Sequence, residues 1–443
     1  MSIDFSRFKL QQWLDWQQQL HPDEIELGLE RVNRTWQALG APALAETVIT
    51  VAGTNGKGSS IAYLEAIYTA AGYRVGSYTS PHLYSYTERI RIGCEAVSEQ
   101  EICDAFAKIE NARKDTRLTY FEFGTLAAFD IFSAANLDIV LLEVGLGGRL
   151  DAVNIVDAEA VLLTSIGIDH VEWLGDTREK IGAEKAGVLR SGQVVICADK
   201  SPPESVSKIA NQLGLTICLA DRDYEVKKVE GAWHWLPIAS PNVALLSSKN
   251  DRPLQSLPFP TMRGDTQITN AAGALAVIMN LYQEYPVPID AVRTGLQSAR
   301  VSGRFEVIPG DISWIFDVAH NVDSTQVLAD NLKSLPCAGR SFALFSVLQD
   351  KDLTSIVELI RDQIDEWVIC PLHTSRGRSF KEISDNIEAL KLHDNQDLFR
   401  NICTVENTHA AMQTLLSRAV PGDRIVVFGS FILVAEVMSL LSK

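Results

Sequence analysis

The chain has 443 residues, of which 46% are hydrophobic and 22% are charged, and its formal net charge is −16 at pH 7. This apolar fraction is large enough to bury a substantial core, so the composition excludes a disordered chain. The acidic charge argues against a nucleic-acid-binding protein, which needs a basic surface to displace counterions from phosphates. Any anionic small ligand must therefore be bound by local cations, helix N-termini or metal ions. The length predicts two or three domains.

The cysteines and the hydropathy pattern indicate a cytoplasmic protein that binds no membrane. The 7 cysteines are odd in number and scattered, without a Cys-x-x-Cys pair, so we predict reduced thiols rather than disulfides or a zinc site. The N-terminus lacks a basic segment followed by an apolar run, so no signal peptide is expected. The apolar segment 425–435 is too short to cross a bilayer.

Predicted strands and helices alternate through the first part of the chain, which is typical of a parallel sheet with crossover helices. The first unit is a strand at 47–51, a glycine-rich turn and a helix at 59–71. Further strands are predicted at 74–78, 138–144, 160–166 and 193–197. The runs at 138–144 and 160–166 are almost continuously apolar, as expected for strands covered on both faces.

The pattern changes after residue 223. Short runs with many Pro and Ser residues, including one at 243–246, predict a small antiparallel sheet or an irregular insertion near 223–260. A helix at 266–282 follows, and a second α/β series is predicted with strands at 313–318, 341–347, 366–370 and 424–428. The predicted fold class is therefore α/β. We expect an N-terminal domain, residues 1–301, with a P-loop-type, mostly parallel sheet flanked by helices, and a smaller Rossmann-like domain, residues 302–443.

The glycine-rich segment 51–60 is the strongest local motif. Its glycines allow successive backbone N–H groups to point at a phosphate, and the following helix adds the positive end of its dipole. Lys57 would contact the β- and γ-phosphates, and Ser59 or Ser60 would reach a magnesium ion. The segment is not a strict Walker A motif, because Val51 stands at the first glycine position. The alternative is an ordinary glycine-rich turn, but the order of strand, turn, lysine and helix favours nucleotide binding.

Polar residues follow three other predicted strands. Glu143 ends one strand, Ser80 follows another, and the pair Asp169 and His170 follows a third. Ligands bind at the carboxyl edge of α/β sheets, and a carboxylate there suits a hard cation such as Mg²⁺. The glycines after Glu143 do not make a dinucleotide motif, because Leu150 occupies the position of the third glycine.

Other candidates carry less information alone. Lys185 by itself would be an exposed helix lysine, and a lone histidine is more often a hydrogen-bonded structural residue than a ligand. Near another strand end, Arg304 accompanies the segment Asp317 to Asn321, in which the polar residues could simply cap turns.

Taken together, the motifs resemble the folylpolyglutamate synthase family of the Mur ligase superfamily over nearly the whole chain. The resemblance is carried by the segments 26–31, 53–59, 79–83, 86–89, 118–122, 143–151, 169–170, 184–187 and 316–321. It implies an ATP-dependent amide ligase that joins L-glutamate to dihydropteroate and to reduced folates such as tetrahydrofolate. In this reaction the pteroyl carboxylate becomes an acyl phosphate, and the amine of glutamate then displaces phosphate.

The resemblance also assigns roles to individual residues. It implies catalytic roles for Lys57, Glu143, His170 and Lys185. It implies nucleotide contacts by Thr54, Asn55, Gly56, Lys57, Gly58, Ser59, Asn270, Arg304, Asp317 and His320. It implies magnesium ligands at Ser59, Ser80, Glu143 and His170, with two ions expected and Lys185 carbamylated. It implies a pterin pocket lined by Glu26, Leu27, Gly28, Thr119, Tyr120, Phe121, Glu122, Leu150, Asp151 and Ala152.

Three readings of the activity remain at this stage. The first is the bifunctional ligase just described, acting as a monomer. The second is a folylpolyglutamate synthase without the dihydropteroate activity, or another Mur-type ligase. The third is a P-loop ATPase of another class, which would leave the His170 and Lys185 segments unexplained. The glutamate site is expected in the C-terminal domain, with Arg376 and Arg378 as candidates for a carboxylate clamp.

Overall fold

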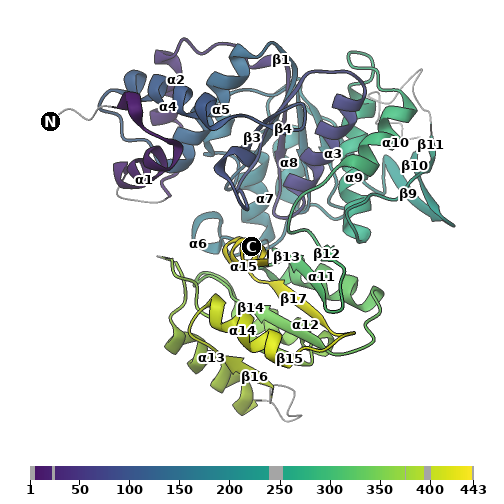
Figure 1. The fold of residues 1–443 in the computed structure, drawn as a ribbon. Coiled ribbons are helices and arrows are strands. Elements are labelled where there is room, and N and C mark those ends of the chain that lie inside the picture. The colour runs from purple at the N-terminus through teal and green to yellow at the C-terminus, as the bar shows by residue number, and fades with distance from the viewer. Residues whose placement is uncertain (1–4, 22–24, 239–252, 375, 394–400, 442–443) are drawn as a thin grey trace. The chain divides into compact units, whose positions relative to one another are not determined.

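The computed structural model describes residues 5–21, 25–238, 253–374, 376–393 and 401–441. The chain divides into two compact units (Figure 1), Met1–Thr261 with Gln267–Arg300, and Met262–Thr266 with Val301–Lys443. The second unit thus takes in a short segment before residue 267 as well as the C-terminal part of the chain. The predicted strand at 243–246 lies outside the described residues.

The first unit is built on a mostly parallel sheet. Within the described residues the spatial order of its 8 strands is β4 (Glu95–Ala96), β3 (Ile90–Ile92), β2 (Val75–Tyr78), β5 (Leu137–Glu143), β1 (Ala45–Ala52), β6 (Ala160–Leu163), β7 (Val194–Cys197) and β8 (Ile217–Leu219). Six strands are parallel to one another, namely β2, β5, β1, β6, β7 and β8. The strands β3 and β4 extend the sheet beyond β2 in antiparallel pairing.

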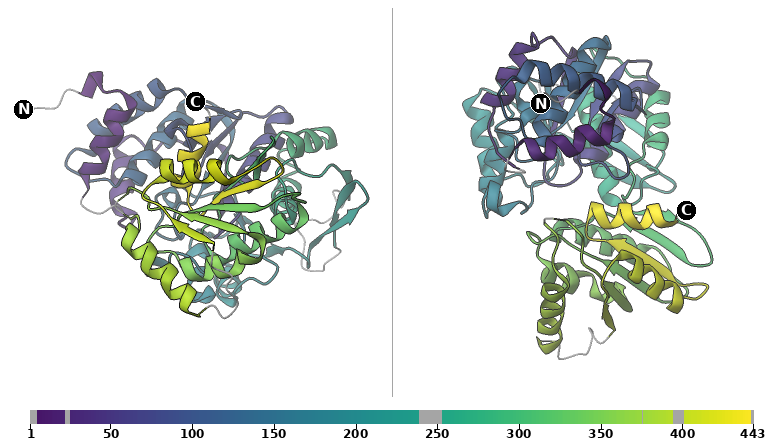
Figure 2. Two further views of the ribbon diagram at one scale, coloured as in Figure 1. Left: turned by 60° about the horizontal axis from the view of Figure 1, so that its bottom comes forward. Right: turned by 60° about the vertical axis from the view of Figure 1, so that its left-hand side comes forward.

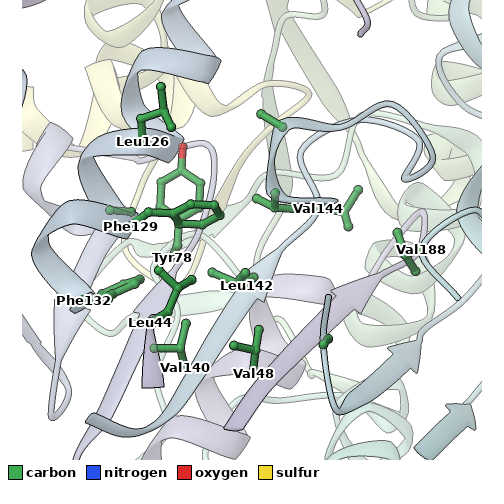
Figure 3. Close-up of a cluster of buried hydrophobic side chains, with 14 of the residues drawn as sticks. Leu44, Val48, Tyr78, Leu126, Phe129, Phe132, Val140, Leu142, Val144 and Val188 are labelled. Carbon is green, nitrogen blue, oxygen red and sulfur yellow. The ribbon is translucent and has the colours of Figure 1, made fainter. Parts of the chain in front are cut away.

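Helices cover both faces of this sheet. They are η1 (Phe5–Arg7), α1 (Leu10–Leu20), α2 (Glu30–Ala38), α3 (Lys57–Ala70), η2 (Tyr86–Arg89), α4 (Glu99–Arg113), α5 (Tyr120–Ala134), η3 (Ala152–Ile155), α6 (Val171–Leu174), α7 (Arg178–Ala186), α8 (Glu204–Gln212), α9 (Asp265–Asn280) and α10 (Ile289–Ser298). On one face α5 packs its Phe129 and Phe132 toward Val140 and Leu142 of β5 (Figure 3). On the opposite face α9 approaches the side chain of Leu162. The adjacent residues of β6, Val161 and Leu163, belong to the hydrophobic core on the face that α5 covers.

The segment after residue 223 forms a separate antiparallel sheet of β9 (Tyr224–Val229), β10 (Ala232–Pro237) and β11 (Leu254–Leu257). Its β10 carries two fully buried tryptophans, Trp233 and Trp235. The indole N–H of Trp235 donates to the carbonyl oxygen of Ala272 in α9 at 3.2 Å, so this sheet is anchored to the helix behind it.

The second unit is a smaller α/β layer structure. Its sheet has the order β12 (Glu306–Ile308), β13 (Ser313–Asp317), β17 (Arg424–Phe428), β14 (Ser341–Phe345), β15 (Glu366–Ile369) and β16 (Ile402–Thr404), in which only β12 is antiparallel among the described strands. Its helices are α11 (Val322–Ser334), α12 (Leu353–Ile360), η4 (Arg361–Gln363), α13 (Phe380–His393), α14 (Thr408–Arg418) and α15 (Phe431–Leu441). Figure 2 shows them packed against the sheet in two further views.

The predicted α/β fold class is confirmed, with a large, mostly parallel N-terminal sheet and a smaller C-terminal one. The parallel strands predicted within the described residues begin and end within three residues of the observed ones, because continuous β-branched and apolar runs specify buried parallel strands locally. Among the described residues, no helix combines the length and the apolar character that a membrane span requires.

Candidate active site

Four neighbouring parallel strands end at one edge of the large sheet. In spatial order β2, β5, β1 and β6 lead into Ser80, Glu143, the glycine-rich loop 53–56 and the loop 164–170. Because the carboxyl ends of parallel strands share an edge, polar groups 63 and 113 residues apart in sequence become neighbours there. The strand order therefore brings these segments together as the sequence predicted.

The glycine-rich loop adopts a shape that only glycine tolerates at two positions. Gly56 has a φ of 92°, and a Cβ there would lie 2.4 Å from Oδ1 of Asn270. At Gly53, a Cβ would lie 1.7 Å from Oγ1 of Thr164. Directly after Gly56, α3 begins, and its first-turn N–H groups have no acceptor within the helix. A helix N-terminus with exposed backbone donors of this kind can bind an anion, and Asn270 lies against the loop.

Two lysine side chains converge on a single backbone oxygen of this loop. Nζ of Lys57 lies 3.0 Å from the carbonyl oxygen of Gly53, and Nζ of Lys185 lies 2.9 Å from the same oxygen. Lys185 is only 3% exposed. Burial and the adjacent Lys57 ammonium lower the pKa of Lys185 to about 7. The prediction of an exposed helix lysine from local sequence is therefore wrong, because α7 packs this side chain under the phosphate loop.

Glu143 stands beside the start of α3. Its Oε2 accepts a hydrogen bond from the backbone N–H of Ser80 at 3.1 Å, and a Cβ on Gly58 would lie 3.6 Å from the same oxygen. The side chain is 5% exposed. A buried carboxylate beside the N-terminus of α3 offers the hard oxygen atoms that a divalent cation prefers, and Ser80 is the adjacent residue.

His170 lies at the N-terminus of the short helix α6 with a φ of 50°. Its backbone N–H donates to Oδ1 of Asp169 at 2.8 Å, and Asp169 is close enough to Lys185 to favour its charged form. No group of three His, Cys, Asp or Glu side chains suited to a metal occurs in the described parts of the chain. A cation at this edge would therefore depend on hydroxyl and phosphate oxygens as well as on Glu143 and His170.

The predicted pterin-pocket segments are tied together by an arginine to which the sequence reasoning gave no role. The guanidinium of Arg31 pairs with Glu26, and it also pairs with Glu122, with Nη2 and Oε1 3.0 Å apart. Glu122 additionally accepts from the backbone N–H of Thr119 at 2.8 Å, which completes a capping box at the start of α5. Arg31 is the last residue of the segment 26–31, so it belongs to a motif that carries the family resemblance.

The third pocket segment is joined to the helix that carries Lys185. The buried carboxylate of Asp151 accepts from the N–H groups of Leu146 and Val153, and burial raises its pKa to about 6. Next to it, the N–H of Arg149 donates to the carbonyl oxygen of Glu184 at 2.9 Å. The Arg149 guanidinium also pairs with the Glu184 carboxylate at 2.9 Å, so several contacts join the loop at residues 150–152 to the helix that carries Lys185.

A second arginine to which the sequence assigned no role lies against Tyr120, in one of the predicted pterin-binding segments. Arg89 is 8% exposed, and its guanidinium carbon lies 5.6 Å from the ring centroid of Tyr120 and 5.2 Å from that of Tyr86. Its Nε donates to Nδ1 of His82 at 2.9 Å. Burial and the Arg89 charge lower the pKa of His82 to about 4, so this imidazole is neutral at pH 7.

In the second unit, Arg304, Asp317 and His320 lie close together at the end of β13. The Asp317 carboxylate accepts from the N–H groups of Phe305 and Ala319, and burial raises its pKa to about 6 against the opposing charge of Arg304. Asn321 caps α11. Turn capping thus accounts for Asn321 and for the bond from Ala319, whereas the bond from Phe305 to Asp317 links two segments 12 residues apart.

Arg376 and Arg378, the two arginines predicted as candidates for binding the glutamate carboxylate, lie in the loop after β15. Arg376 pairs with Asp350 at 3.1 Å. Nη2 of Arg378 donates to the carbonyl oxygens of Gln349 and Lys351, so this arginine joins the two loops.

Comparison with known proteins covers both units. Residues 51–278 match the Mur ligase middle domain, and residues 303–431 match the Mur ligase, glutamate ligase domain. The chain is 38% identical to the dihydrofolate synthase/folylpolyglutamate synthase of Escherichia coli (strain K12), over 98% of this chain and 95% of that protein. It is similar in structure to E. coli FolC in complex with DHPP and ADP, with a TM-score of 0.88, 37% identity, and coverage of 100% of this chain and 99% of that one. It is also similar to a bifunctional folylpolyglutamate synthase/dihydrofolate synthase with Mn, AMPPNP and L-glutamate bound, with a TM-score of 0.87, 39% identity and full coverage of both chains.

Proposed function

The chain belongs to the dihydrofolate synthase/folylpolyglutamate synthase family of Mur ligases, and we propose that it joins L-glutamate to dihydropteroate and to reduced folates with consumption of ATP. One observation carries the proposal. The N-terminus of α3, the carboxylate of Glu143 and two lysines meet at the carboxyl edge of four adjacent strands. Such a site suits a reaction in which two anions, a carboxylate and a polyphosphate, must approach each other.

The reaction has two steps that the residues would serve. The pteroyl carboxylate attacks the γ-phosphorus of ATP, and ADP leaves. The amine of L-glutamate then attacks the acyl carbon, phosphate leaves, and an amide bond forms. Lys57 and the first-turn N–H groups of Gly58 and Ser59 would bind the phosphates, while Asn270 would contact the nucleotide. For the second unit we propose nucleotide contacts by Arg304, Asp317 and His320.

We assign the divalent cation to Ser59, Ser80, Glu143 and His170. The hard-oxygen set around Glu143 supports this assignment, as do the Mn-bound relative and the carboxylate's position beside α3. A cation bound there would neutralise phosphate oxygens as the substrate carboxylate approaches them.

We further propose that Lys185 is carbamylated, and its burial and depressed pKa support this. Its amine nitrogen would attack the carbon of CO₂, form an N–C bond and release one proton. This attack needs the neutral amine, and a pKa of about 7 keeps about half of the side chains neutral at pH 7. The product is an anion, which would suit a second magnesium ion in place of an ammonium group.

The pteroyl group would bind between the segments 26–28, 119–122 and 150–152, which the contacts of Arg31 and the loop at Arg149 hold in place. We also propose that the protein acts as a cytoplasmic monomer. All 7 cysteines are free thiols, which supports a reducing compartment. Light scattering after size-exclusion chromatography measures the oligomeric state.

A substrate panel tests the function. ADP and phosphate release are measured with dihydropteroate, tetrahydrofolate or neither, each with and without L-glutamate. The bifunctional ligase predicts turnover with either pteroyl substrate that depends on L-glutamate. Turnover with tetrahydrofolate alone would identify the monofunctional synthase instead. ATP hydrolysis independent of both substrates would contradict a ligase.

A further inference from the structure

The hydroxyl of Thr54 is fully engaged away from the phosphate-binding helix end. Its Oγ1 donates to the carbonyl oxygen of Gly167 at 3.1 Å and accepts from the N–H of Gly167 at 3.0 Å. The backbone N–H of Thr54 donates to the carbonyl oxygen of Ser165 at 2.6 Å. A hydroxyl has a single proton, so neither donor of Thr54 can reach a phosphate oxygen without breaking a bond to the loop 165–167.

Ser165 makes the reciprocal contact. Its Oγ accepts from the backbone N–H of Asn55 at 3.3 Å and donates to the carbonyl oxygen of Asn55 at 3.1 Å. Two hydroxyls, one from each loop, thus each bind both backbone groups of a residue in the opposite loop. We call these contacts among Thr54, Asn55, Ser165 and Gly167 the double-hydroxyl clamp. Because each side chain fixes a peptide N–H and a C=O together, the clamp restrains rotation of the peptide units on either side of the facing residue.

We propose that Ser165 and Thr54 are positioning residues, whose clamp sets the phosphate loop at a fixed distance from His170 so that one nucleotide–metal geometry is preferred. The inference rests on the proposed function for the identity of the ligand. The phosphate loop leads into α3, and the clamped segment 165–167 leads directly into Asp169 and His170. Without the clamp, the two loops could change position relative to each other, although each would remain attached to its own strand.

The test uses the full-length chain and calorimetric titration with ADP, with and without Mg²⁺. Ser165→Ala removes both bonds to Asn55, and Ser165→Thr retains the hydroxyl. Ser191→Ala is the matched control, because its Oγ makes one bond of 3.0 Å to the carbonyl oxygen of Leu213, outside the site. Thr54→Val, which preserves shape and removes both bonds to Gly167, tests the clamp from the other loop if Ser165→Ala does not fold.

We expect Ser165→Ala to bind ADP about tenfold more weakly in the presence of Mg²⁺, which corresponds to about 1.4 kcal/mol. Without Mg²⁺, ADP affinity should change by less than about twofold, since the clamp acts on the relation between the two loops. Ser165→Thr should restore the wild-type difference between the two titrations, and Ser191→Ala should leave it unchanged. A fold that is merely less stable would not weaken the Mg²⁺-dependent part alone.

Two results overturn the clamp's role while leaving the proposed function standing. These are an unchanged affinity of Ser165→Ala for Mg·ADP, and an equal loss of ADP affinity with and without Mg²⁺. Absence of ADP binding by the wild-type chain overturns the clamp's role and the proposed function together. Tight Mg·ADP binding that depends on Ser165, in a chain without glutamate-dependent turnover, supports the clamp and overturns the ligase proposal.

Discussion

Replacing Lys185 by alanine tests the carbamate directly. An unperturbed lysine with a pKa of 10.5 is neutral in about one molecule in three thousand at pH 7, whereas a pKa of about 7 leaves about half neutral. The environment of Lys185 therefore raises the reactive fraction by about a thousandfold. We expect Lys185→Ala to lower the rate of ADP release by at least about a hundredfold, because a site that neutralises approaching anions loses one of its fixed groups.

Two controls sharpen this experiment. Lys180→Ala removes a lysine from the same helix, where the side chain is 63% exposed and pairs with Asp176, and it should leave activity unchanged. Added short-chain carboxylic acids should partly restore Lys185→Ala, because an acid can occupy the space that the buried side chain leaves. Unimpaired turnover by Lys185→Ala would refute the reasoning, as would failure of every acid to restore it.

The pKa of Lys185 also predicts how labelling of this residue with ¹³CO₂ depends on pH. Below pH 7 the amine becomes protonated and cannot attack CO₂, so the neutral fraction falls from about nine-tenths at pH 8 to about one-tenth at pH 6. At a fixed concentration of dissolved ¹³CO₂ that leaves most of Lys185 unmodified at pH 8, the carbamate ¹³C resonance should fall at least about ninefold over this range. The unmodified folded chain also binds fewer protons than the unfolded one between pH 7 and 10.5, so Lys185 makes the free energy of unfolding rise with pH there. A labelling signal that grows toward acid pH would contradict the assignment.

Three further predictions follow from local contacts. Gln17→Leu should raise the free energy of unfolding by about 1–3 kcal/mol in urea titrations, because Gln17 is 1% exposed and neither amide atom has a partner among the described residues; a loss of stability would contradict this. Gly56→Ala should weaken ADP binding more than about tenfold in calorimetry. Gly72→Ala is the control, because Gly72 has a similar φ of 95° but open space around its Cβ, and it should not weaken binding. Equal effects of the two substitutions would mean that backbone strain alone explains the loss. Arg31→Met should raise KM for the pteroyl substrate but not for ATP in initial-rate assays, because it frees the buried Glu122; parallel increases would argue against a local effect.

The sequence by itself determined the elements and their order at the site. The strand at β1, the glycine-rich turn and helix α3 are specified by an apolar run, glycines and a helical stripe that lie within 30 residues of one another. Ser80, Glu143 and His170 became candidates because each lies at or after the end of such a run, and parallel strands bring their carboxyl ends to one edge. Local hydrophobic patterning carries this information, since it depends on neighbours along the chain.

Only the tertiary structure decided the partners and the charge states. The hydroxyl of Thr54, a residue that the family resemblance lists among the nucleotide contacts, is bonded to Gly167, 113 residues away. Likewise, the partner of Lys185 is the carbonyl oxygen of Gly53, 132 residues away, and its pKa follows from the burial that this packing produces. Hydrogen bonds act over about 3 Å and desolvation depends on every atom packed around a group, so neither can be read from residues adjacent in sequence.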